Sequence, residues 1–408
     1  MTMLVNKKLL IYGKTLQNRV VFQPMEGCDG ELNGAVSDLT YRRYMRFAES
    51  GAGLIWFEAV AVSGECRANP RQLFLNDNTK ESFKKLLDDM RKKSIEMYGF
   101  APIIVMQMTN SGRWSKPNGT PEPIIAYHNK HWEIGKENLP YTIATDEYCE
   151  GIVEKYRKKT LLAKEVGFDG IDVKCCHGYL FDEFLSAFDR KGKYGGSLEN
   201  RTRLFFDCID AVKSNLSEDM FVTTRLNACD NFPYPYGFGV DKNNNIDLSE
   251  TNWIIKKLKG KGIELINITL GNPYLIPHIN RPCMNAPEKG EEGLARIYKV
   301  TKELQKANPD ISLIASGLSY PAENCMEYAE KILEDNVAKL VGFGRMTLAY
   351  PQFYQDYLKN GKLEKNKCCI KCSKCTELMR NGTVAGCVIR DSEKYMPYYR
   401  KYVLKKED

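Results

Sequence analysis

The 408-residue sequence has no internal repeat, no low-complexity segment and no long apolar run. Its apolar stretches fall short of the roughly 20 residues that a membrane-spanning helix needs. The N-terminal run MTMLVNKKLL turns polar at once and lacks the apolar core of a secretory leader. These absences predict a cytoplasmic protein that does not enter a membrane.

Cysteine is too sparse for a disulfide scaffold. The 14 cysteines are mostly scattered singly, as expected of reduced thiols, and the exception is a cluster near residue 370. The formal net charge is +7, and residues 361–408 hold twelve Lys and Arg against six Asp and Glu. This basic tail suits an acidic partner protein, whereas the charge pattern as a whole does not favour nucleic acid, so we expect no nucleic-acid partner.

Short β-branched runs alternate with amphipathic helical stretches, which is typical of βαβ units around a parallel sheet. The helices have recognisable ends: one begins near Asp38 and ends before Gly51, and another begins near Asp146 and ends before Gly167. The eight predicted strands are residues 18–25, 53–60, 101–108, 170–175, 220–227, 264–270, 312–317 and 338–344.

Eight such units predict a closed α/β barrel, a (β/α)8 TIM barrel, over residues 1–355. The alternation stops near residues 351–361, so a small C-terminal cysteine-rich segment is expected at 356–408. The segments after the third to sixth strands are long and rich in Pro, Gly, Asn and aromatic residues. Loops at the C-terminal strand ends build the active site of such barrels, so functional residues are expected there.

Four closely spaced thiols are the strongest local motif. Cys369, Cys372 and Cys375 lie at three-residue spacing, and Cys387 follows after eleven residues. Such runs bind iron–sulfur clusters, while structural zinc more often uses two separated Cys-x2-Cys pairs, so a [4Fe–4S] cluster is favoured over zinc. Cys368 adjoins the motif and is a competing ligand.

Two strand ends carry glycines suited to phosphate. Ser316 and Gly317 end the seventh strand, and Gly344 and Arg345 end the eighth. Barrels commonly bind phosphate in the loops after these strands, and an arginine supplies charge-assisted hydrogen bonds. Glycines needed only for tight turns are the alternative interpretation.

A polar cluster leaves the fourth strand. Lys174, His177 and Tyr179 follow one another closely enough to converge on one substrate atom. The chain has only four histidines, which makes one at this position notable, although a single histidine is more often structural than catalytic.

These residues resemble the old yellow enzyme family of NADH:flavin oxidoreductases, and within it the iron–sulfur branch with 2,4-dienoyl-CoA reductase and trimethylamine dehydrogenase. The resemblance spans about residues 16–388. Its most specific motifs are HGYLFDEFLS at 177–186 and YGGSLENR at 194–201, and NRVVFQPM at 18–25 and the pair Gln107 and Arg113 support it. The chain resembles that branch truncated to the barrel and the cluster segment.

The resemblance implies an FMN cofactor across the barrel mouth and a set of residues around it. Pro24, Met25 and Glu26 would lie near the ring, Gln107 at its pyrimidine edge, Arg225 near N1 and O2, and Ser316, Gly317, Gly344 and Arg345 at the phosphate. A cation beside N1 stabilises the anionic reduced flavin.

The implied reaction is an ene-reduction of a small-molecule substrate with an activated C=C bond, an α,β-unsaturated carbonyl or carboxylate. Tyr179 would protonate the α carbon, while Lys174 and His177 would bind the carbonyl oxygen. Three positions depart from the family pattern: Lys174 replaces a histidine, Glu26 replaces Thr or Cys, and Asn110 replaces a histidine. A carboxylate at Glu26 disfavours the reduced anion unless it is protonated or paired.

Cluster-containing relatives usually continue into dinucleotide-binding domains, and no Gly-x-Gly-x-x-Gly fingerprint occurs here. The electrons are therefore expected from NAD(P)H or, through the cluster, from a ferredoxin, a flavodoxin or a reductase subunit. Two alternatives are an amine dehydrogenase, against which Lys174 argues, and a non-catalytic electron-transfer subunit with a structural zinc, against which Tyr179 and His177 argue.

Overall fold

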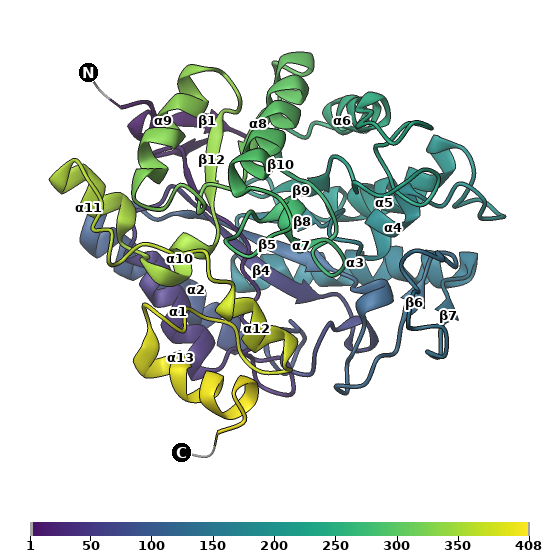
Figure 1. The fold of residues 1–408 in the computed structure, drawn as a ribbon, viewed down its shortest axis with the longest axis horizontal. Helices are drawn as coiled ribbons and strands as arrows, with labels where there is room; N and C mark the ends of the chain where they lie inside the picture. The colour runs from purple at the N-terminus through teal and green to yellow at the C-terminus, as the bar shows by residue number, and fades with distance from the viewer. Residues whose placement is uncertain (1–2, 407–408) are drawn as a thin grey trace.

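The computed structural model describes residues 3–406. Residues 1–2 of the expected barrel and residues 407–408 of the expected C-terminal segment lie outside the described residues. Eight parallel strands close into a barrel (Figure 1). In barrel order they are β3 (Val20–Phe22), β4 (Leu54–Ala61), β5 (Ile103–Thr109), β8 (Gly170–Val173), β9 (Phe221–Asn227), β10 (Leu265–Thr269), β11 (Ser312–Ala315) and β12 (Leu340–Phe343). Each overlaps a predicted strand, and the predicted (β/α)8 fold is confirmed.

Helices surround the barrel. The longer ones are α1 (Asp38–Ala48), α2 (Lys80–Tyr98), α3 (Asp146–Val166), α5 (Leu198–Lys213), α6 (Ser249–Gly260), α8 (Gly290–Ala307), α9 (Cys325–Glu334) and α11 (Phe353–Asn360). The Thr145 side chain caps α3 by accepting from the backbone N–H of Tyr148, and Gly167 ends it at φ +95°. None of the helices in residues 3–406 is both long and apolar enough to cross a membrane.

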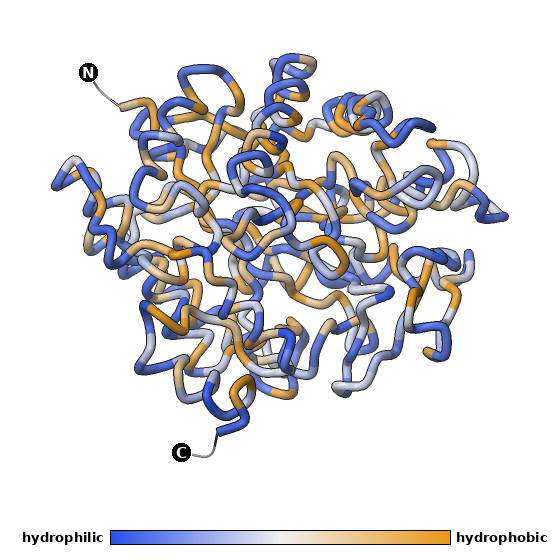
Figure 2. The backbone as a smooth tube through the Cα atoms, viewed as in Figure 1, coloured by the Kyte–Doolittle hydropathy of each residue, from blue (hydrophilic) through white to orange (hydrophobic). Residues whose placement is uncertain are grey.

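The strands are buried on both faces, as expected of a parallel sheet covered by helices, and all eight residues of β4 are buried. Hydrophobic segments accordingly run through the middle of the molecule, while the tips of outlying loops and helices are mostly hydrophilic (Figure 2). A hairpin of β1 (Leu9–Ile11) and β2 (Lys14–Leu16), which we did not predict, packs on the interior side chains. Its Tyr12 stacks on Phe221 at a centroid distance of 4.4 Å, near the start of β9.

The C-terminal segment folds back onto the barrel. It contains α12 (Lys374–Arg380), α13 (Ser392–Tyr398) and η5 (Tyr399–Val403), and in Figure 1 α13 lies beside α1. The backbone N–H of Ala385 donates to the Gly27 carbonyl at 2.6 Å. Asp391 accepts from Arg42 at 2.8 Å and from Arg46 at 2.6 Å, both on α1. The segment is therefore anchored next to the loop that leaves β3.

Replacing Asp391 tests this anchor. Asp391→Asn removes the charge shared by two arginines, and we expect the free energy of unfolding to fall by about 1.5–3 kcal/mol, the range for hydrogen bonds to charged groups. Denaturant unfolding of the purified protein measures it. Asp310→Asn, between α8 and β11, is the control, because its ion pair with Lys259 is exposed and is worth less than about 1 kcal/mol. Equal effects of the two changes would contradict the anchoring role.

Candidate active site

One cavity of about 1200 Å³, its open mouth included, lies at the C-terminal ends of the strands. The structure brings every residue expected at the cofactor or the substrate together in its wall. These are Pro24, Met25, Glu26, Gln107, Lys174, His177, Tyr179, Arg225, Ser316, Gly317, Gly344 and Arg345. The wall also holds residues that we did not single out, among them Tyr274, Asn280, Arg281 and Arg380.

Two arginines in this wall keep unused hydrogen-bond donors. Within the described residues, Arg225 Nε and Arg345 Nη1 are buried without a partner, while Arg345 Nη2 donates to the Pro282 carbonyl at 2.6 Å. Buried charged donors without a partner cost free energy, so these two fit an anionic ligand. Gly317 has φ +88°, and a Cβ there would lie 3.1 Å from Leu294, which leaves room only for glycine. The part of the wall formed by Arg225, Gly317 and Arg345 therefore fits the phosphate and the pyrimidine ring of a flavin.

One buried carboxyl group supports two of these residues, the side chain of Gln107 and the backbone of Arg225, and sequence reasoning missed it. Asp172 on β8 accepts from Gln107 Nε2 at 2.6 Å and from the backbone N–H of Arg225 at 2.7 Å. Burial raises the pKa of Asp172 to about 6, against the opposing effect of these hydrogen bonds. Ser316 Oγ donates to a β10 carbonyl at 2.8 Å, so this hydroxyl supports the sheet as well as lining the cavity.

The loop after β8 points its three predicted catalytic side chains into the cavity. Lys174 Nζ lies 3.6 Å from the centroid of the Tyr179 ring. His177 has the left-handed φ of +68°, and its Nε2 lies 3.2 Å from the donor Nδ2 of Asn280. Burial lowers the pKa of His177 well below its usual value, and the nearby charge of Arg225 lowers it further. A neutral imidazole is therefore available for hydrogen bonding.

Tyr179 is 2% exposed, and its hydroxyl lies 2.9 Å from that of Tyr274. Burial raises the pKa of Tyr179 well above its usual value, and the neighbouring Glu26 raises it further. The phenol is therefore protonated near neutral pH and can donate a proton. No sequence signal identified Tyr274, because it comes from the irregular loop after β10.

Glu26, one of the departures from the family pattern, also lines the cavity. Burial raises the pKa of its carboxyl group, and Lys174 opposes this shift. Asn69 Nδ2 donates to it at 3.1 Å. The raised pKa favours the protonated form of this carboxyl group, and the Asn69 amide is a hydrogen-bond donor to it.

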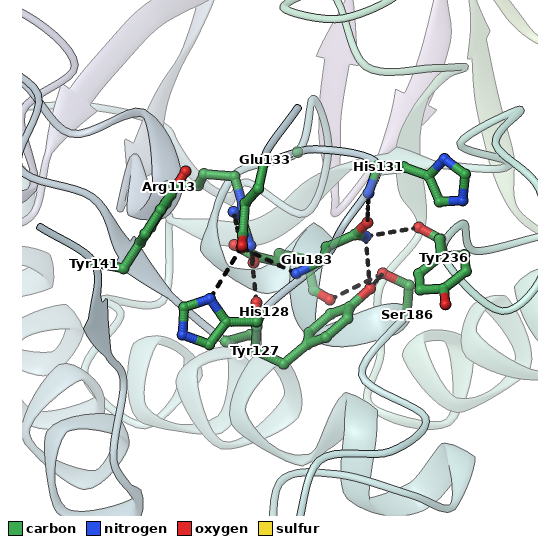
Figure 3. A network of polar contacts seen from close by, with 12 residues as sticks. Arg113, Tyr127, His128, His131, Glu133, Tyr141, Glu183, Ser186 and Tyr236 are labelled. Carbon is green, nitrogen blue, oxygen red and sulfur yellow. Dashed lines mark hydrogen bonds and ion pairs between the residues drawn. The ribbon is translucent and has the colours of Figure 1, made fainter. Parts of the chain in front are cut away.

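The motif residues that carry the family resemblance form a buried support around this loop. Arg113 contacts Glu133 at 2.7 Å and Glu183 at 2.5 Å, and it donates to the Tyr127 carbonyl at 2.8 Å, within one polar network (Figure 3). In the same motif, Asp182 accepts from the Gly178 N–H at 2.6 Å and so holds the turn between His177 and Tyr179.

Asn110 is likewise a supporting residue. It accepts from the Gly112 N–H at 2.9 Å and donates to the Tyr148 hydroxyl at 3.1 Å, and it is not part of the cavity wall. The family's histidine at this position is therefore replaced here by a residue that serves the loop after β5.

The four predicted ligand thiols, Cys369, Cys372, Cys375 and Cys387, line a second cavity of about 350 Å³. In residues 3–406 no three His, Cys, Asp or Glu side chains converge on a point as ligands of one metal ion. Thiolates on a cubane bind separate iron atoms and so need not converge, whereas a tetrahedral zinc site requires it.

The two cavities share part of their walls. Cys375, Arg345 and Leu348 line both. Cys368 is not in either wall, and its thiol lies 3.4 Å from the Glu364 carbonyl. A group bound by the four thiols would thus lie next to the larger cavity.

Comparison with known proteins identifies the family. The model of the NADH:flavin oxidoreductase / NADH oxidase family matches residues 9–364. The chain belongs to this family, and it is an FMN-dependent oxidoreductase. NADPH dehydrogenase of Bacillus licheniformis is 29% identical over 375 residues, which cover 88% of this chain and 97% of the relative. NADH oxidase of Thermoanaerobacter brockii is 28% identical over 363 residues, which cover 88% of this chain but 51% of the relative.

Solved structures share the fold. Old Yellow Enzyme from Pichia sp. AKU4542 superimposes with a TM-score of 0.68 at 20% identity, covering 88% of this chain and 87% of that one. 2-Naphthoyl-CoA reductase gives a TM-score of 0.78 at 20% identity, covering 95% of this chain and 56% of that one. Histamine dehydrogenase from Rhizobium sp. 4-9 gives 0.73 at 17% identity, covering 95% and 53%. This chain thus spans little more than half the length of the last two.

Proposed function

We propose that the protein is an FMN-dependent ene-reductase that reduces a C=C bond conjugated to a carbonyl or carboxylate group. The observation that carries this proposal is the buried, protonated Tyr179 in the same cavity as the residues suited to FMN. When bound, FMN supplies hydride from N5 to the β carbon of the substrate. Tyr179 gives its proton to the α carbon, and Lys174 and His177 hold the carbonyl oxygen.

The charges of the cavity favour a substrate with an oxyanion or a carboxylate. Lys174, Arg281 and Arg380 line it in addition to the two arginines suited to FMN, against one acidic residue, Glu26. The same cations disfavour the alternative, oxidation of a small amine, because a cationic substrate would meet like charges. A non-catalytic electron-transfer subunit has no need of a buried proton donor at this position.

For the C-terminal segment, residues 356–408, we propose a separate cluster-binding unit after the barrel of residues 1–355. Cys369, Cys372, Cys375 and Cys387 would hold a [4Fe–4S] cluster, as in the iron–sulfur branch of the family. The shared wall at Cys375 supports electron transfer between cluster and FMN. Such a cluster suits the cytoplasm, because thiolate ligands need a reducing compartment.

We further propose that FMN is reduced by NAD(P)H or, through the cluster, by an acidic carrier such as ferredoxin or flavodoxin, or by a reductase subunit. The basic tail would steer an acidic donor, and steering of this kind weakens with added salt. Reduction by such a donor at a rate independent of salt would contradict this part of the proposal.

An anaerobic absorbance spectrum of the purified protein, with flavin, iron, sulfide and zinc quantified, tests the cofactor content. We expect about one FMN, four iron and four sulfide per chain. Oxidation of the reduced flavin by a panel of enones and enoates then tests the reaction. Zinc without flavin would overturn the proposal, and FMN without iron would remove the cluster but leave the ene-reductase.

A further inference from the structure

We propose that Tyr274 is a proton relay that returns a proton from solvent to Tyr179 after each turnover. The inference rests on the proposed role of Tyr179 as the proton donor. A donor that has lost its proton must regain one before the next cycle, and a buried phenol cannot take it directly from bulk water.

The Tyr179 hydroxyl has a single hydrogen-bond partner in the described part of the chain, and this partner is the Tyr274 hydroxyl at 2.9 Å. Tyr179 is 2% exposed, whereas Tyr274, which also lines the cavity, is only half-buried. A phenol both donates and accepts, so it can pass a proton along a chain of hydroxyl groups. Tyr274 can thus pass a proton from the open side of the cavity to the buried Tyr179.

The relay geometry is held by one tryptophan. The Tyr274 ring stacks on Trp114 with centroids 4.3 Å apart and an interplanar angle of 6°. Trp114 Nε1 donates to the Gly178 carbonyl at 2.9 Å, which fixes the residue before Tyr179. The backbone N–H of Tyr274 donates to Asn272 Oδ1 at 3.0 Å. Both hydroxyl groups are therefore positioned by the same scaffold.

Charged groups near the pair favour two neutral phenols at rest. Burial is the largest cause of the raised pKa of each phenol, and Glu26 is the second. Lys174 lies over the Tyr179 ring and can stabilise the phenolate that forms transiently there.

The proton balance of the relay is simple. The Tyr179 O–H bond breaks as its proton joins the α carbon, which leaves a phenolate. The Tyr274 hydroxyl then gives its proton to this phenolate, and Tyr274 takes a proton from water in the cavity mouth. Each cycle consumes one solvent proton, and no further reactant is needed.

A single-turnover experiment in weakly buffered solution tests the relay. The reduced holoenzyme is mixed with an enone while flavin absorbance reports oxidation and a pH indicator reports proton uptake. We expect the two signals to coincide in the unmodified protein. In Tyr274→Phe the ring and its stacking remain, so flavin oxidation should slow only modestly, while proton uptake lags behind it by roughly tenfold or more.

Two further variants, Tyr41→Phe and Tyr179→Phe, make the outcome decisive. Tyr41→Phe removes a hydroxyl group that donates to Asp89 on the barrel exterior. In this variant proton uptake should still coincide with flavin oxidation. Coincident signals in Tyr274→Phe, or a loss of flavin oxidation as large as in Tyr179→Phe, would overturn the relay. Normal flavin oxidation in Tyr179→Phe would instead refute the proposed role of Tyr179 as the proton donor, on which the relay rests.

Discussion

Tyr179→Phe is expected to retain FMN and to lower turnover by roughly 100-fold or more, the effect of losing a positioned general acid. The substitution keeps the aromatic ring against Lys174 and removes only the hydroxyl that is bonded to Tyr274. Stopped-flow oxidation of the reduced flavin by an enone measures the step in which this proton is used. Flavin absorbance of the purified variant checks that the cofactor is still bound.

The reductive half-reaction provides the internal control. Reduction of FMN by NAD(P)H does not use the Tyr179 proton, so its rate should change far less than the rate of oxidation by the enone. Equal loss in both half-reactions would indicate a general disturbance of the cavity. Unchanged oxidation would show that the proton comes from another group.

Cys375→Ser is expected to abolish the cluster, lowering iron from about four per chain towards zero. A serine oxygen is a poor substitute for a thiolate at such a site, and Cys375 is the thiol that lines both cavities. Iron analysis and the visible spectrum measure the loss. FMN reduction by a protein donor should slow, while reduction by NAD(P)H directly over the flavin should continue.

Cys368→Ser is the matched control for this change. Cys368 is the neighbour of the motif, yet its thiol faces the Glu364 carbonyl and not the thiol-lined cavity. Full iron content in this variant and none in Cys375→Ser would support the assigned ligand set. Loss of iron in both would make Cys368 a ligand, and unchanged donor-driven reduction in Cys375→Ser would make the cluster structural.

The strands and helix ends followed from local patterns. Runs such as 53–60 are buried on both faces and are therefore apolar except for Glu58, which is paired with Arg43. Gly167 ends α3 because a left-handed φ is needed there. The N-terminal hairpin escaped prediction because its strands, Leu9–Ile11 and Lys14–Leu16, are too short to show a period. Its partner, the bottom of the barrel, is formed by residues far away in the chain.

Side chains at strand ends were predictable as members of one site because all strands of a parallel barrel end on the same face. This rule predicted that Lys174 and Arg345 lie in one site without knowledge of the loops, while Arg225 came from the family resemblance, and all three line the cavity. Asp172 was missed as a supporting group because its position within a strand does not indicate which side chains it will contact in the folded protein.

The alternation of β-branched runs with amphipathic helical stretches, the glycines at turns and the spaced thiols are local properties of the chain. The order of residues alone therefore determined the barrel, the strand-end residues and the four-thiol motif. Which loop residues meet across the barrel mouth depends on contacts between segments far apart in the chain. The pairing of Tyr179 with Tyr274, and the shared wall at Cys375, are of this second kind. Only the folded chain could decide them, because loop conformation is set by packing and not by a repeating pattern.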